Sequence, residues 1–214
     1  MHATRSRLGA LFLAGAVLLS ACTSPQERID SLPLQDFLVT QQELPEGFTT
    51  TPIRGTELAN ATEGNLAAQP AHCAEPSKKW LDGSSEAVGT YLEYPAAEVV
   101  VALLLVRPAQ DFAPIGDYLK QCRKHQRAGE GLRIKVELKD YPPPATAALS
   151  AMGYQERITL PKSAPVSSTY LYTTHSGISV IAILRSRQKT PSRGQISSLN
   201  SIFKGQIEKI DGVK

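Results

Sequence analysis

The segment that most restricts the fold of this chain is a run of eight apolar residues, Val99–Val106. A strand of this composition has no face for water, which predicts a central strand that is buried on both sides of a sheet. Eight apolar residues could also form a buried helix, but the four valines and the flanking Pro95 and Pro108 favour a strand. The apolar stretch Ala87–Tyr94 precedes it across a proline turn, so the two predict a hairpin.

Periodicity elsewhere predicts an α+β domain. Leu132–Leu138 alternates strictly between apolar and charged residues, as a half-buried strand does. In 112–127, Ile115, Tyr118, Leu119 and Cys122 recur at helical spacing, so the whole segment is expected to be a helix. Further helices are expected from Ser31, over 70–81 and over 195–210, and further strands over 48–53, 153–160, 166–174 and 178–185. Consecutive hairpins favour a mainly antiparallel sheet with helices packed on one face.

The amino terminus predicts export and lipid attachment. Residues 1–7 are basic, and the apolar run 8–19 is shorter than the roughly 20 residues that a spanning helix needs. Leu19-Ser20-Ala21-Cys22 resembles the lipobox of bacterial lipoproteins, in which Cys22 would carry acyl chains and become the first mature residue. The alternative is an ordinary signal peptide that is cut near Ala21. With the lipid, the protein would be held at the cell membrane on its extracytoplasmic side.

The predicted organisation is therefore a signal peptide (1–21), a lipidated tether (22–30) and a single extracytoplasmic domain (31–214).

Charge excludes a nucleic-acid partner. The chain has 23 Lys and Arg against 20 Asp and Glu, and removal of Arg5 and Arg7 with the signal leaves 21 against 20. A near-neutral exported chain carries no footprint for nucleic acid.

With Cys22 assigned to lipid, Cys73 and Cys122 remain as a pair. In an oxidising compartment such a pair predicts a disulfide, and closing a loop of about fifty residues is worth about 4 kcal/mol in the chain-entropy model. Two free thiols are the alternative. A metal site is not expected, because two isolated sulfurs without CxxC spacing make a poor zinc signature.

Several of these features together resemble the extracytoplasmic sensor domain of actinobacterial PknH-type receptor kinases, and free-standing lipoproteins on a similar plan. The resemblance is carried by Leu44-Pro-Glu-Gly-Phe48, by Pro70-Ala-His-Cys73, by the hairpin into Val99–Val106 and by the helix with Cys122. It implies an α+β fold with a central cleft and a ligand-binding role, and it assigns no functional residue. Kinase domains of this class carry two disulfides, whereas this chain can form one.

No enzyme or cofactor motif is found. The chain lacks Gly-x-Ser-x-Gly, HExxH, a P-loop and Gly-x-Gly-x-x-Gly, so we expect neither catalysis nor a cofactor. His175 could serve a hydrolase, but at a hairpin tip it is expected to be a solvated turn residue. His72 could tune a neighbouring thiol, but beside Cys73 it is expected to be a neighbour of the disulfide.

One charged feature could carry function. Lys120, Arg123, Lys124 and Arg127 form a basic run at the expected end of a helix. The helix dipole and solvation explain such a run without function, and contact with an anionic lipid surface is the alternative. Two function classes follow: a sensor-like module that binds a small or lipidic envelope ligand, or an interaction lipoprotein that docks another envelope protein.

Overall fold

The computed structural model describes residues 25–53, 66–74, 76, 86–129, 131–148 and 150–212. Nine strands of this part form one sheet, and each neighbouring pair is antiparallel, in the order β1-β3-β4-β9-β8-β7-β6-β5-β2. The strands are β1 Thr49–Ile53, β2 Ala67–Gln69, β3 Glu86–Tyr94, β4 Val99–Arg107, β5 Lys124–Gly129, β6 Leu132–Asp140, β7 Ala151–Thr159, β8 Val166–His175 and β9 Ile178–Ser186. The predicted α+β class, mainly antiparallel sheet and single disulfide are confirmed.

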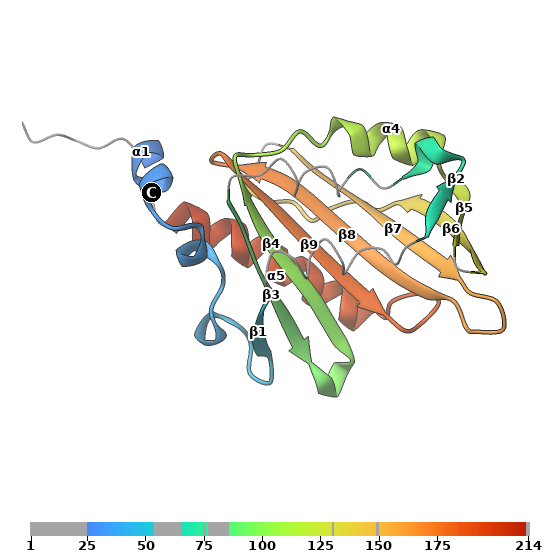
Figure 1. Cartoon of the computed structure of the whole chain (residues 1–214). Helices are drawn as coiled ribbons and strands as arrows, with labels where there is room; N and C mark the ends of the chain where they lie inside the picture. The colour runs from blue at the N-terminus through green and yellow to red at the C-terminus, as the bar shows by residue number, and fades with distance from the viewer. Residues whose placement is uncertain are drawn as a thin grey trace, which may run out of the picture.

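The helices are short except for the last. They are α1 Pro25–Ser31, α4 Ala113–Gln121 and α5 Arg193–Gly212, with 3-10 turns η1 Leu34–Phe37, η2 Gln41–Glu43, η3 Ala71–Cys73 and η4 Pro95–Ala97. In Figure 1, α5 runs behind the sheet, while α4 lies along its upper margin. None of the helices in the described part has the length and apolarity to cross a bilayer.

Strand β4 is an interior strand of the sheet and is buried on both faces, as its composition predicts. Val101, Leu103 and Leu105 pack with α5 and the N-terminal turns in one apolar cluster. Ala102 and Leu104 face the other way and pack with α4 in a second cluster. Helices therefore cover both faces of the sheet, and not one face as the consecutive hairpins suggested.

The predicted helix over 112–127 differs from the structure in its second half. The helix ends at Gln121, and Cys122, the last residue of the apolar stripe, is its C-cap. From Lys124 onward the chain is strand β5, paired with β6. An alternating pattern replaces the helical one here: His125 and Arg127 are buried, whereas Lys124 and Gln126 are more exposed.

Two other boundaries differ. The segment 22–30, expected to be an unstructured tether, includes α1, in which Ile29 is only 1% exposed and belongs to the core. Helix α1, which starts three residues after position 22, is thus packed on the domain through Ile29. Of the helix expected over 70–81, the described part is the turn η3, which follows the short strand β2.

Candidate functional site

The disulfide joins two elements at the β5 edge of the sheet. Cys73 in η3 and Cys122 at the end of α4 are bonded, with a Cα–Cα distance of 5.5 Å. Both cysteines are 1% exposed, so the bond lies inside the core of the α4 face. The predicted pairing is confirmed, and its partner element on the Cys73 side is a 3-10 turn.

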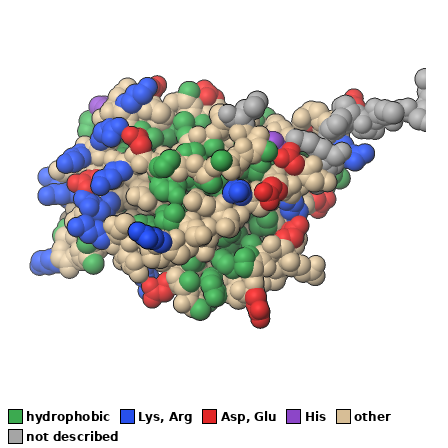
Figure 2. Space-filling view, turned by 180° about the vertical axis from the view of Figure 1, so that it is seen from behind, with side chains coloured by type: hydrophobic (Ala, Val, Ile, Leu, Met, Phe, Trp, Pro, Cys, Tyr) green, Lys and Arg blue, Asp and Glu red, His purple; other side chains and the backbone are tan. Residues whose placement is uncertain are grey.

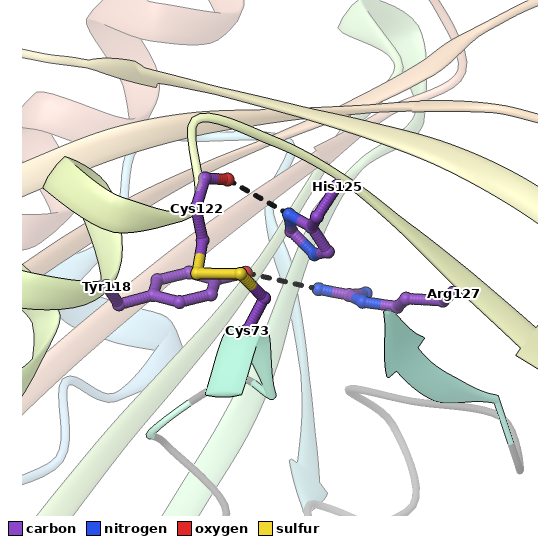
Figure 3. Close-up of a disulfide and its surroundings, with 5 residues drawn as sticks. All are labelled: Cys73, Tyr118, Cys122, His125 and Arg127. Carbon is purple, nitrogen blue, oxygen red and sulfur yellow. Dashed lines mark hydrogen bonds between the residues drawn. A yellow bond between two sulfur atoms is a disulfide. The ribbon is translucent and has the colours of Figure 1, made fainter. Parts of the chain in front are cut away.

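Polar side chains surround this bond, as Figure 3 shows. The His125 ring donates from Nδ1 to the carbonyl oxygen of Cys122 at 3.0 Å. Arg127 donates to the hydroxyl of Tyr118 at 3.5 Å. Atoms of His72, Cys73 and Cys122 lie within 4.8 Å of one another, but sulfurs bonded to each other are not thiolate ligands for a metal.

Arg127 forms a buried ion pair with Glu156 of β7. Their nitrogen and oxygen atoms are 2.6 Å apart, and the two side chains are 4% and 3% exposed. Tyr170 donates to the other oxygen of Glu156 at 3.2 Å. The predicted anionic-surface role of Arg127 is therefore wrong, because strand geometry turns this side chain into the core, where its charge is neutralised by Glu156.

Stacked tyrosines continue from this ion pair across the α4 face. The rings of Tyr154 and Tyr170 are 4.5 Å apart and nearly parallel, and Tyr172 stacks beyond them. All three side chains are at most 3% exposed. These residues give the face a rigid aromatic floor.

Beyond the aromatic floor lies a cavity of about 810 Å³. Its wall comes from four adjacent strands: in register across the sheet, Val100 of β4 faces Arg185 of β9, which faces Ser168 of β8, which faces Glu156 of β7. The lining residues are Glu93, Pro95, Glu98, Val99, Val100, Glu156, Ile158, Val166, Ser167, Ser168, Tyr170, Arg185, Ser186 and Arg187. The lining therefore combines apolar side chains, hydroxyls, carboxylates and guanidinium groups.

One residue of this site, Glu156, could have been recognised from the sequence by its position in the alternating pattern of β7. Alternation in β7 puts Tyr154, Glu156 and Ile158 on the same face, and the neighbours of Glu156 on that face are core residues. A carboxylate at a core-facing position needs a buried partner, so Glu156 could have been identified from the pattern. The partner could not, because Arg127 lies in a segment that was expected to be helical.

The other predicted contact residues are exposed, and each has an acidic partner. Lys120 is 3.8 Å from Asp117, Arg123 is 2.8 Å from Asp140, and Lys124 is 4.0 Å from Glu137. They do not form one patch: Lys120 belongs to α4, whereas Lys124 faces outward from the opposite side of the sheet. Cys22, the predicted lipidation site, lies outside the described residues.

We expected His175 to be a solvated residue at the hairpin tip, but the structure shows that it is mostly buried. Its side chain is 11% exposed, and Nε2 lies 2.7 Å from a carboxylate oxygen of Asp211. This contact fastens the β8–β9 turn to the end of α5, which gives His175 a structural role.

Comparison with known proteins shows which solved structures have a similar fold. No family model matches the chain, and no curated protein matches it. The fold is similar to the crystal structure of the extracellular domain of PknH from Mycobacterium tuberculosis: the TM-score is 0.55 at 11% identity, over 83% of this chain and 94% of that one. An uncharacterised protein of Mycobacterium smegmatis, the Rv0999 ortholog, gives a TM-score of 0.48 at 13% identity, over 86% and 96% of the two chains. The predicted resemblance to the PknH-type extracytoplasmic domain is thus confirmed at the level of the fold.

Proposed function

We propose that this chain is a lipid-anchored extracytoplasmic module, similar to a sensor domain, that binds a small amphipathic ligand in the cavity on the α4 face. The observation that carries the proposal is the cavity itself. Its volume of about 810 Å³ falls within the range typical of small-molecule sites. The fold likeness to an extracellular domain and the export signal in the sequence support the extracytoplasmic setting.

The lining indicates the chemistry of the ligand. Val100, Ile158 and Val166 offer an apolar surface for a chain or ring system. Ser168 and Tyr170 add hydroxyls, and the lining also offers carboxylates and guanidinium groups. A ligand with an apolar body and a charged or zwitterionic head fits this arrangement. Catalysis is not part of the proposal, because the buried Glu156 already pairs with Arg127.

The alternative function, docking of another protein through an apolar patch, receives less support. Within the described ranges, the large apolar side chains are mostly covered, and the most exposed of them is Leu132, at 37%. A docking surface of the apolar kind needs a contiguous patch. We therefore keep ligand binding as the proposed function.

A dansyl-labelled fatty acid tests the cavity. The mature chain from residue 22, carrying Cys22→Ser, should enhance the dansyl emission when the dye is excited directly. Val100→Phe puts a ring into the cavity and should weaken probe binding about tenfold or more, since the ring occupies the volume of the ligand. Lys204→Phe, at an exposed position on α5, is the matched control and should leave binding unchanged. Equal binding by Val100→Phe and the unchanged chain would refute the cavity as the site.

A further inference from the structure

The outer part of the sheet carries a second feature that the cavity does not use. Strands β5, β6 and β7 bury one side against the α4 core, and alternate residues face the opposite side. The outward cations are Lys124, Arg133, Lys135, Lys139 and Arg157, which we call the basic face. Pairing across the strands brings Lys124 and Arg157 to either side of Glu137.

Charge on the basic face is not balanced locally. Glu137 contacts both Lys124 and Arg157, and it is the one carboxylate at the described outward positions of these three strands. Five cations therefore meet a single acid in a chain that is nearly neutral as a whole. Such local concentration produces a positive potential that attracts polyanions.

No helix in the described part of the chain covers this face. Helix α5 packs mainly on β4, β9 and β8, and it borders the basic face at Tyr141, the residue after β6, whose hydroxyl is hydrogen-bonded to Asn200. Figure 2, which views the molecule from behind, shows Lys and Arg side chains gathered at the side where β5, β6 and β7 lie. Helix α1 lies at the other end of the molecule in Figure 1.

The spacing of the cations suits a linear partner. Arg133, Lys135 and Lys139 lie on the outward side of one strand, with Glu137 between the last two, and this row extends for about 20 Å at about 3.4 Å per residue. Lys124 and Arg157 widen the row on the neighbouring strands. Guanidinium groups bind phosphate through two parallel hydrogen bonds, and lysines add point charges.

From these observations we infer that the basic face binds a linear polymer of the cell envelope whose negative charges are phosphate groups. The orientation argues for a polymer over the membrane of the protein itself. Helix α1 begins three residues after Cys22, so an anchor there holds that end of the domain at the bilayer. The basic face at the far end is then directed away from that bilayer. Failure of the cavity proposal would leave this inference intact, because the two sites share no cation.

Binding of fluorescently labelled polyphosphate to the mature chain tests the inference. Affinity should fall as salt rises, because each neutralised phosphate releases counter-ions. Reversing two charges of the row, Lys135→Glu with Lys139→Glu, should weaken binding about tenfold or more at low salt and flatten the salt dependence. The neutral pair Lys135→Gln with Lys139→Gln should give a smaller loss in the same direction, with an unchanged circular dichroism spectrum.

The matched control makes the same change in net charge elsewhere. Lys120→Glu with Lys204→Glu alters two exposed lysines on α4 and α5, outside the basic face, and should leave binding within about twofold. Equal loss in the control pair would mean that net charge alone drives binding, and would overturn the inference. Equal affinity for polyglutamate would refute the phosphate assignment. Tighter binding to phosphatidylglycerol vesicles, lost in the Lys135 and Lys139 variants, would assign the face to lipid instead.

Discussion

Arg127 and Glu156 lie in a buried environment that limits substitution. Both are nearly inaccessible to water, and each neutralises the charge of the other at 2.6 Å. Removing two charges from water is costly, so a buried pair depends on good geometry and on further hydrogen bonds, such as the one from Tyr170. Loss of one partner should therefore do more harm than loss of both.

A double-mutant cycle measures this dependence. Arg127→Met should lower the free energy of unfolding by about 3–5 kcal/mol, because Glu156 is left as an uncompensated buried charge. Adding Glu156→Leu should recover most of that loss, since the pair is then replaced by apolar side chains of similar size. Urea unfolding followed by circular dichroism gives the values. Additive losses in the double variant would contradict the coupling.

Glu43 gives the fold a mild dependence on pH. Burial raises the pKa of Glu43, but hydrogen bonds from Lys209 and Thr40 outweigh that effect and hold the pKa below its ordinary value. A pKa that is lower in the folded state stabilises the fold above the unfolded-state value, and this stabilisation is lost as the pH falls through the folded-state value. The contact ties η2 to α5.

We expect Glu43→Gln to lower stability at pH 7 and to matter little in acid. The side chain of Glu43 is 44% exposed, so solvent screening limits the loss to about 0.5 kcal/mol. The difference from the unchanged chain should shrink as the pH falls below about 4.5, where the unfolded-state carboxyl protonates. Thermal unfolding at several pH values measures it, with Glu46→Gln as a control in the same segment. A difference that stays constant down to acid pH would contradict the prediction.

At the scale of elements, strand β5 shows where the sequence was informative and where it was not. Continuous apolarity predicted β4, and strict alternation predicted β6, because one pattern alone accounts for each. In β5 the inward side chains are His125 and Arg127, which are polar, so hydrophobic periodicity carries no signal. Pairing with β6 in a hairpin, together with burial of Arg127 against Glu156, makes a strand of this segment.

The cavity was beyond sequence reasoning for a related reason. Its lining comes from β4, β7, β8 and β9 together with the β3–β4 turn. Each strand was predicted, but the order β4-β9-β8-β7 joins segments that are up to about eighty residues apart. Hairpin signals fix neighbours along the chain and leave the pairing of β4 with β9 undetermined.

The disulfide links η3, which follows the edge strand β2, to the end of α4, and its loss should loosen this edge of the sheet. The bond closes a loop across a sequence separation of 49 residues, for which the chain-entropy model gives about 4 kcal/mol and measured values are often lower. Cys73→Ala with Cys122→Ala should lower the melting temperature of the mature chain. Hydrogen exchange should rise first in β5 and β2, which lie at this edge. Equal melting of both chains would show that packing alone holds η3 in place.

The whole molecule combines a proposed anchor at one end with a basic face at the other. Sequence features support the anchor: a basic start, a short apolar run and Cys22 behind small residues. The structure adds that helix α1 starts at Pro25 and that Ile29 of this helix belongs to the core. A lipid at Cys22 would thus leave almost no tether, and the domain would sit close to the membrane.

Cys22→Ser tests the anchor in cells. The thiol is the proposed acyl acceptor, so its loss should move the protein from the membrane fraction to an uncleaved or released form without the mass of acyl chains. Two or more chains hold a protein stably, at about 0.8 kcal/mol for each buried methylene, so the shift should be nearly complete. Thr23→Ser, which changes the next residue and keeps the thiol, is the control and should stay in the membrane. A Cys22→Ser protein that remains in the membrane at the same intact mass would refute the lipid anchor, and with it the fixed orientation that directs the basic face away from the bilayer.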